Sequence, residues 1–290
     1  MDNTPEHPLV HPLSDRRMAA LATLLCDDDP AVSLVAKTEI LTHGLAAKEW
    51  LDRCRLSQDP TLRKRSTAII RDLGELEADR EFFKFCLRKG EDLDLEMGCW
   101  LLSRTRYPEV NIVGYKALLD DFSQQLREAL KGASKPEEVL GRINRLLFGE
   151  LGFLGDDKDY YGARNSYLTR VIDRRRGNPI SLCVLILLLS RRLQLPIVGI
   201  GLPGHFLCRM QTATGDIYMD AFHQGRLLHK ADCVKYLRQA GYEFHDAFLM
   251  PASPRRILLR MCSNLHQIYL RRGDDQRAGR VKSYIVALSR

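Results

Sequence analysis

The stretch RRRGNPISLCVLILLLSRRLQLPIVGIGLPGHFLCRM, residues 174–210, decides the fold because a helix pattern in it passes directly into a strand pattern. Residues 179–193 are apolar on every side of a helix, which is typical of a central, buried helix. A loop with Gly177 and Asn178 leads into that helix. Beyond residue 195 the apolar period changes from 3.6 to 2, which indicates β-strands.

Four short strand-like segments follow the apolar helix. Their sequences are PIVGIGL, HFLCRM, GDIYMDAF and GRLLH, all within residues 196–229. The segment TATGD, residues 212–216, predicts a hairpin turn between the second and the third. A helix packed on an antiparallel meander predicts an α+β domain.

The residues before this domain favour helices. Asp29-Pro30 and Asp59-Pro60 each stand after one helical run and before another. Aspartate can cap a helix and proline fits its first position. The pattern is similar to HEAT repeats, so we expect a helical repeat-like region over residues 1–105, with a flexible lead at residues 1–16. A further helical stretch is expected over residues 80–104.

The chain closes with two more helical patterns joined at Gly273-Asp274. They resemble one tetratricopeptide unit. The sequence therefore predicts three parts: the repeat-like region to residue 105, an α+β core over residues 106–252, and a helical pair over residues 253–290.

The composition is that of a soluble globular protein, with 45% hydrophobic and 28% charged residues. The longest apolar run, residues 182–189, is too short to cross a bilayer, and no apolar signal segment is visible at the start, so we expect a cytoplasmic protein without membrane contact. No two cysteines form a CxxC pair, which gives no support to a zinc or redox site. The eight cysteines are Cys26, Cys54, Cys86, Cys99, Cys183, Cys208, Cys233 and Cys262.

The net charge of +7 is concentrated at the end of the chain. Residues 254–290 hold nine Arg or Lys and two Asp, which equals the whole excess. A basic segment can bind nucleic acid, but a solvated helix face is the favoured interpretation because no aromatic residues alternate with the basic ones.

Two residues on neighbouring strand-like segments can form a catalytic pair. His205 stands at the start of HFLCRM, and Asp220 lies 15 residues later in YMDAF. On a hairpin the two can lie side by side, and the carboxylate then holds the imidazole in one tautomer. Such a pair needs a thiol or hydroxyl at a helix N-terminus, where the helix dipole favours the thiolate.

The same residues carry a resemblance to a known family. Residues 165–210, followed by YMDAF, resemble the SirB-type branch of the transglutaminase-like superfamily, and LFGELGF (residues 147–153) and DYYGARNSYL (residues 159–168) extend the pattern. The resemblance covers residues 107–248 well, and residues 257–274 also fit. It implies a papain-like core with a tetratricopeptide-like tail, and hence an α+β transglutaminase-like fold with mostly helical N-terminal and C-terminal flanks.

The family resemblance also implies a Cys-His-Asp triad, of which His205 and Asp220 match the last two members. Counting back from LQLPIV, the position of the nucleophile falls near Pro179, which has no reactive atom. Cys183 shares that helix face but lies about 6 Å deeper, whereas a nucleophile must come within about 3 Å of its base. Ser181 is rotated by about 200° and is expected to satisfy an amide at the helix start. We interpret Cys183 as a core residue, with a displaced nucleophile at Cys183 or Ser181 as the alternatives.

Several other residues of the core have side chains that could serve a site. Cys208 alternates with His205 along its strand and is expected in the core. His223 and His229 are expected to be exposed loop residues. The acidic loop with Asp156, Asp157 and Asp159 lacks the spacing of a calcium loop, so no metal is expected. The residues that the family pattern places along the cleft are Tyr160, Tyr161, Asn165, Asn178, Pro179 and Gly204.

Two functional classes follow. The first is a core without its nucleophile that serves as a protein- or peptide-binding or scaffold module, whose helical arms extend the surface. The second is a hydrolase or acyl transferase that uses Cys183 or Ser181 with His205 and Asp220. No cofactor is expected, a protein or peptide is the expected partner, nucleic acid is not, and the sequence leaves the oligomeric state open.

Overall fold

The computed structural model describes residues 14–212 and 215–290. The described residues divide into two compact units, the first within residues 14–78 and 105–109 and the second within residues 79–104, 110–212 and 215–290. A flexible lead was expected over residues 1–16. Residues 1–13 of it lie outside the described residues. For residues 14–16 the expectation is wrong, because Ser14 is the N-cap of α1 (Asp15–Leu25). None of the helices in the described part of the chain has the length and hydropathy needed to cross a bilayer.

The first unit consists of α1, α2 (Pro30–Thr42), the 3₁₀ turn η1 (Gly44–Ala47), α3 (Lys48–Cys54) and the first part of α4 (Pro60–Cys86). Both Asp-Pro pairs start helices, as predicted. The side chain of Asp29 accepts a hydrogen bond from the Ala31 amide, and that of Asp59 accepts one from the Thr61 amide, both at 2.8 Å.

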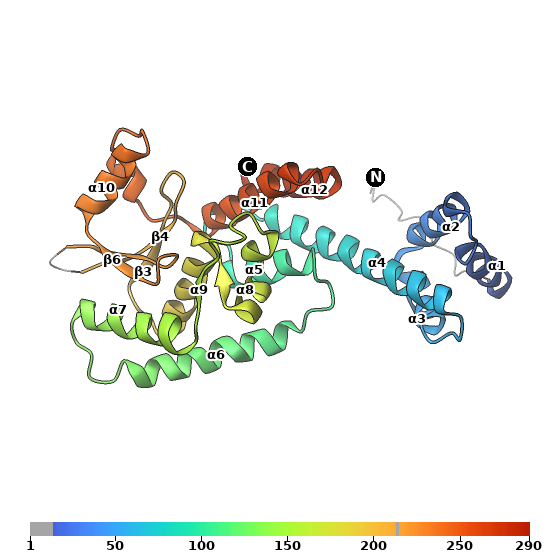
Figure 1. Ribbon diagram of the computed structural model, residues 1–290, viewed down its shortest axis with the longest axis horizontal. Helices are drawn as coiled ribbons and strands as arrows, with labels where there is room; N and C mark the ends of the chain where they lie inside the picture. The colour runs from blue at the N-terminus through green and yellow to red at the C-terminus, as the bar shows by residue number, and fades with distance from the viewer. Residues whose placement is uncertain (1–13, 213–214) are drawn as a thin grey trace, which may run out of the picture. The chain divides into compact units, whose positions relative to one another are not determined.

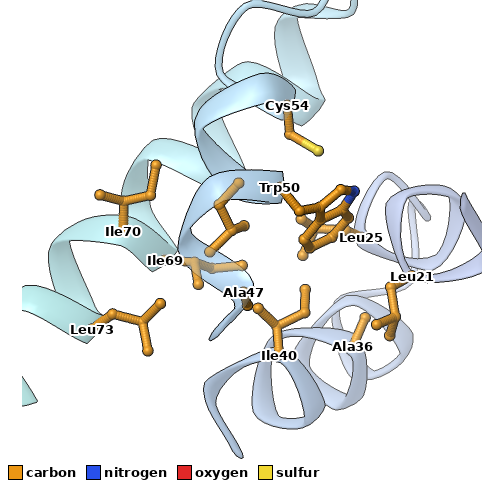
Figure 2. Close-up of a cluster of buried hydrophobic side chains, with 11 residues drawn as sticks. Leu21, Leu25, Ala36, Ile40, Ala47, Trp50, Cys54, Ile69, Ile70 and Leu73 are labelled. Atoms are coloured by element: carbon orange, nitrogen blue, oxygen red, sulfur yellow. The ribbon is translucent and has the colours of Figure 1, made fainter. Parts of the chain in front are cut away.

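One apolar cluster holds the first unit together. Figure 2 shows side chains from α1, α2, α3 and α4 meeting around Trp50, which is buried. Because each of these short helices buries only one face, none of them is expected to be stable alone. The members of the cluster are Leu21, Leu25, Ala36, Ile40, Ala47, Trp50, Leu51, Cys54, Ile69, Ile70 and Leu73.

The helix α4 differs from the expectation. Instead of ending before a separate stretch over residues 80–104, it continues through Gly74 to Cys86. Gly74 is used for close packing, because a Cβ there would lie 2.8 Å from Pro108. The chain leaves the helical path after α4, and Gly90 in the loop has a φ of +97°, which suits glycine. The next helix, α5 (Leu95–Arg104), is capped by the Asp94 side chain, which accepts a hydrogen bond from the Met97 amide at 3.1 Å.

The second unit surrounds the helix predicted to be central, α9 (Pro179–Arg192), nearly all of whose residues are buried. The elements between α5 and α9 are α6 (Ile112–Ala129), α7 (Pro136–Asn144), the π-helical turn η2 (Arg145–Glu150), β1 (Leu154–Gly155), η3 (Ala163–Ser166), α8 (Leu168–Arg174) and β2 (Arg176–Gly177). Those after α9 are β3 (Ile197–Ile200), β4 (Leu207–Met210), β5 (Ile217–Asp220), β6 (Arg226–Leu228), α10 (Lys230–Gln239), η4 (Asp246–Leu249), α11 (Pro254–Arg271) and α12 (Asp275–Leu288).

The predicted meander is present as a four-stranded antiparallel sheet in the order β3-β4-β5-β6. The sheet lies between α9 and α10 (Figure 1). On β4, Cys208 faces α9, and its thiol lies 3.8 Å from the carbonyl of Cys183; the neighbouring Leu207 packs with Cys233 and Leu237 of α10. Every residue of β4 and β5 is therefore buried. The helix α10 was not predicted.

Two arginines attach neighbouring helices to this core. Arg192, at the end of α9, binds Glu96 of α5 at 2.7 Å and Asp120 of α6 at 2.8 Å. Arg255 is buried and donates hydrogen bonds to the carbonyl oxygens of Gly90 (2.8 Å), Leu288 (3.0 Å) and Arg88. The second arginine thereby fixes α11 and α12 to the loop before α5. The architecture is α+β with helical flanks, as the sequence predicted.

Because α9 supports the sheet, loss of side-chain volume in it should reduce stability. We expect Val184→Ala, at a fully buried position, to lower the free energy of unfolding by about 2 kcal/mol. The matched control is Val113→Ala in α6, where the side chain is 78% exposed and the change should stay within about 0.5 kcal/mol. Urea unfolding of both variants measures the difference, and equal effects would contradict a central role for α9.

Candidate functional site

The start of α9 is fixed by a reciprocal capping box. The Asn178 side chain accepts a hydrogen bond from the Ser181 amide at 3.0 Å, and the Ser181 hydroxyl accepts one from the Asn178 amide at 3.1 Å. Pro179 occupies the first helical position. The helix therefore begins where the sequence predicted, and the hydroxyl of Ser181 is buried and engaged in the cap.

A buried polar network holds the loop in front of this cap. The Asn178 amide group donates to the Ser166 hydroxyl at 3.0 Å, and Asn165 donates to the Asp159 carbonyl at 2.7 Å. Arg174 donates to the Asn165 side chain at 2.8 Å. Asn165 is fully buried, so its expected place along the cleft is wrong; it anchors the loop instead.

Cys183 is a residue of α9, and it lies on the side of the helix that packs against β4. Its side chain is fully buried, and its thiol lies 3.5 Å from the carbonyl oxygen of Phe206. Burial raises the pKa of the Cys183 thiol well above that of an ordinary cysteine. No hydrogen bond joins Cys183 or Ser181 to the imidazole of His205 in the part of the chain that the structure describes.

His205 and Asp220 lie side by side. Nε2 of His205 is 2.8 Å from Oδ2 of Asp220. His205 precedes β4 by two residues rather than starting it, and Asp220 is the last residue of β5. The side chain of His205 is 12% exposed, and its backbone carbonyl accepts a hydrogen bond from Arg260 at 2.9 Å.

The sequence did not reveal a third member of this group. Nδ1 of His223 lies 2.8 Å from the same Oδ2 of Asp220. His223 is exposed, as expected, and it also contacts Asp220. The spacing of three residues between Asp220 and His223 across a turn was the only signal for this contact. Oδ1 of Asp220 accepts from the amides of Phe222 and His223.

The environment of Asp220 favours its ionised form. Burial is the largest single influence and raises its pKa, but the hydrogen bonds and charges of His205 and His223 together outweigh burial. The pKa of Asp220 therefore lies below that of an ordinary carboxyl. A carboxylate is thus present to accept hydrogen bonds from both imidazoles.

A pocket of about 320 Å³, here called the cap pocket, opens at the start of α9. It brings together most of the residues expected along the cleft, together with His205 and a face of α11 that the sequence analysis missed. Arg260, Asn264, Gln267 and Arg271 follow one another at spacings of four, three and four residues, which place them on one side of a helix. This row of polar side chains on one side of the helix was the sequence signal that could have indicated a pocket wall. The other lining residues are Tyr160, Tyr161, Asn178, Pro179, Ile180, Gly204, His205, Phe206 and Ile268.

A second pocket, of about 380 Å³ and here called the dyad pocket, opens beside α10. It contains Asp220 and His223, and it shares His205 with the cap pocket. Nε2 of His205 is engaged by Asp220. The remaining lining residues of the dyad pocket are Leu202, Leu207, Arg226, Leu228, Asp232, Cys233, Lys235, Tyr236 and Gln239.

Two carboxylates of the acidic loop form ion pairs with arginines. Asp156 binds Arg174 at 2.8 Å, while Asp159 lies 3.6 Å from Arg164 and 3.7 Å from Arg272. His229 was expected to be an exposed loop residue; it is the N-cap of α10, where its amide donates to Asp232 at 2.8 Å. Among the residues described, the one group with metal-ligand chemistry is His205, Asp220 and His223, whose donor atoms all lie within 4.8 Å of one another.

Comparison with known proteins agrees with this architecture. A family model described as the transglutaminase-like superfamily matches residues 114–263. A UPF0162 protein from Xylella fastidiosa is 36% identical over 204 residues, which cover 68% of this chain and 73% of the relative. A UPF0162 protein from Pseudomonas aeruginosa is 37% identical over 160 residues, covering 54% of this chain and 57% of the relative.

A third relative shares the core alone. F-box only protein 21 of Homo sapiens is 37% identical over 147 residues, which are 48% of this chain and 23% of that protein. No solved structure matches the chain at a significant level. The family match covers more than half of the 290 residues, and it confirms the predicted fold. The chain belongs to the transglutaminase-like superfamily and is related to the UPF0162 proteins.

Proposed function

We propose that this protein is a peptide-binding module built on a transglutaminase-like core that has lost its nucleophile. One observation carries the proposal: the helix that should present a nucleophile to His205 begins with Pro179, which lines the cap pocket and has no ionisable atom. The nearest thiol on that helix, Cys183, is buried with a raised pKa. Such a pocket can hold a ligand but cannot attack it.

The cap pocket has the chemistry for an acidic peptide. Two guanidinium groups, Arg260 and Arg271, line it, and no carboxylate of a described residue does. Burial lowers the pKa of Arg260, so an anionic ligand would offset the cost of keeping that charge out of water. Arg271 lies 4.1 Å from the ring centroid of Tyr161, which holds the guanidinium at the rim.

The amides and the helix start complete the recognition surface. Asn264 and Gln267 can bind a peptide backbone, since each offers both a donor and an acceptor. The positive end of the α9 dipole is at Asn178, which favours a carboxylate nearby. The ligand class that fits is a peptide with an Asp or Glu side chain or a free C-terminus.

The wider assignment follows from the sequence motifs. The segments LFGELGF and DYYGARNSYL, with residues 165–210, support the SirB-type branch, and α11 with α12 supports a tetratricopeptide-like pair. We place the boundaries of the repeat-like arm, the core and the helical pair at residues 105 and 252. The two arms would extend the binding surface for a protein partner in the cytoplasm.

Nucleic acid is not part of this proposal because many basic residues near the C-terminus have partners within the chain. Arg255 binds backbone carbonyls, Arg277 pairs with Asp274 at 2.5 Å, and Arg280 pairs with Asp79 at 2.9 Å. Arg260 and Arg271 face the cap pocket. Few charges are left to form a continuous basic face.

The second candidate is a hydrolase or acyl transferase that uses Cys183 or Ser181. The hydrogen bond between His205 and Asp220 is the observation in its favour, because it orients an imidazole as a general base requires. The accessibility of the thiols separates the two candidates.

Alkylation should leave Cys183 unmodified in the native protein. We expect iodoacetamide at neutral pH to reach only Cys26, since it is the one cysteine of the chain that is not buried, and to modify all eight after unfolding in guanidinium. Peptide mass spectrometry measures each site. Stoichiometric native modification of Cys183 that disappears in His205→Ala would establish the enzyme instead.

A thiol placed at the first position of α9 should recover the missing reactivity. We expect Pro179→Cys to be alkylated at neutral pH faster than an ordinary free thiol, because the helix start and His205 both favour the thiolate. The double variant Pro179→Cys with His205→Ala should react several-fold more slowly. Equal rates would show that residue 179 does not face the imidazole.

The peptide proposal predicts a dependence on the two arginines. On an array of peptides, those with Asp, Glu or a free C-terminus should bind, and their amidated counterparts should bind more weakly. We expect Arg260→Ala to raise Kd about 10-fold or more, the effect of losing a charged hydrogen bond of about 1.5–3 kcal/mol. Arg256→Ala, on an exposed position of the same helix, is the control. Equal Kd values for all three proteins would exclude the cap pocket as the binding site.

A further inference from the structure

We propose that His205, Asp220 and His223 form a binding site for a first-row divalent metal ion such as Zn²⁺, open to the dyad pocket. Two imidazoles and one carboxylate are a ligand set that first-row metals use with open coordination positions. The three donor atoms are Nε2 of His205, Oδ2 of Asp220 and Nδ1 of His223, and they lie within 4.8 Å of one another.

The spacing of the donors suits a metal. Each nitrogen lies 2.8 Å from Oδ2. Two ligands at about 2.1 Å from a metal are about 3 Å apart at the right angle of an octahedral site and about 3.4 Å apart at the tetrahedral angle of zinc, so each nitrogen must move a few tenths of an ångström away from Oδ2. The donor atoms lie within 4.8 Å of one another, and two nitrogens bound to the same metal would lie closer together than that. The His223 side chain is 63% exposed, so its ring has room to make this adjustment.

The carboxylate is prepared for such a ligand. Oδ1 of Asp220 is held by the amides of Phe222 (3.1 Å) and His223 (3.3 Å), which fixes the orientation of the group and leaves Oδ2 to face both rings. Such outer contacts are what orient the ligands in metal sites. For a cation to bind here, each neutral imidazole must carry its proton on the other ring nitrogen, Nδ1 in His205 and Nε2 in His223, so that the nitrogen facing Oδ2 offers a lone pair.

The dyad pocket leaves room for further ligands. Its volume of about 380 Å³ admits water to the coordination positions that the protein does not fill. Arg226 and Lys235 also line it, so the charge around a bound cation would attract an anionic co-ligand such as a carboxylate. The Asp232 carboxylate in the same lining accepts the His229 amide and is thereby committed to the α10 cap.

The two proposals share His205, which lines both pockets, but they rest on different further residues. The peptide proposal depends on Arg260 and Arg271 of α11, and the metal proposal depends on Asp220 and His223. Arg260→Ala and His223→Ala therefore test the two proposals separately.

The test uses the full chain without an affinity tag, stripped with a chelator and kept reduced. Titration with Zn²⁺ by calorimetry should give one site per chain, and zinc should remain after desalting. Co²⁺ should give visible absorption bands of a bound complex. His223→Ala should weaken Zn²⁺ binding by at least about 10-fold, as even changes outside the ligand set cost 10- to 100-fold.

The controls separate the site from other zinc ligands. Asp220→Asn should also weaken binding, whereas His245→Ala, an exposed imidazole outside the group, should leave Kd unchanged. His223→Ala retains all eight cysteines, so its loss of affinity cannot come from thiols. Because His223 is exposed, circular dichroism should show this variant folded. Absence of a 1:1 site in the unchanged protein, or equal affinity in folded His223→Ala, would overturn the proposal.

Discussion

The capping box between Asn178 and Ser181 is the contact on which the rest of the site depends. It satisfies backbone groups at both ends of the first turn and so fixes the residue at which α9 begins. A start one turn later would bring Cys183 to the helix end, where the dipole could activate it. With the observed start, the thiol lies a full turn inside and contacts the carbonyl of Phe206. One local interaction thus fixes how far Cys183 lies from the start of the helix.

The second constraint is the burial of Asp220 at the end of β5. Its charge needs compensation, and two imidazoles and two amides supply it. His205 lines two pockets at once, and its Nε2 is committed to Asp220. The two pockets are lined by different helices, the cap pocket by α11 and the dyad pocket by α10. A ligand that changes the protonation of His205 in one pocket therefore also changes the lining of the other pocket.

The sequence predicted those parts of the fold that depend on local periodicity. The apolar run of α9, the alternation of β3 to β6 and the Asp-Pro starts of α2 and α4 are all readable in short windows. The misses depended on distant contacts. A separate helical stretch was expected from residue 80, but α4 continues to Cys86, with Pro108 packed against Gly74. Asn165 looks like a cleft residue, but Arg174 and the Asp159 carbonyl hold it inside. The α11 stripe becomes a pocket wall only because the chain folds back over α9.

A paired histidine and aspartate do not by themselves indicate catalysis. Once Asp220 is buried, removing His205 would leave a poorly compensated charge in the core, and that cost is severe whether or not the pair ever transfers a proton. The pair therefore has a structural role whether or not the core contains a nucleophile. The residues on which the proposed binding function rests are Pro179, which has no reactive atom, and Arg260 and Arg271, whose guanidinium groups offer charge to an anion. On the proposed function, the lining of the cap pocket matters more than the pair of His205 and Asp220.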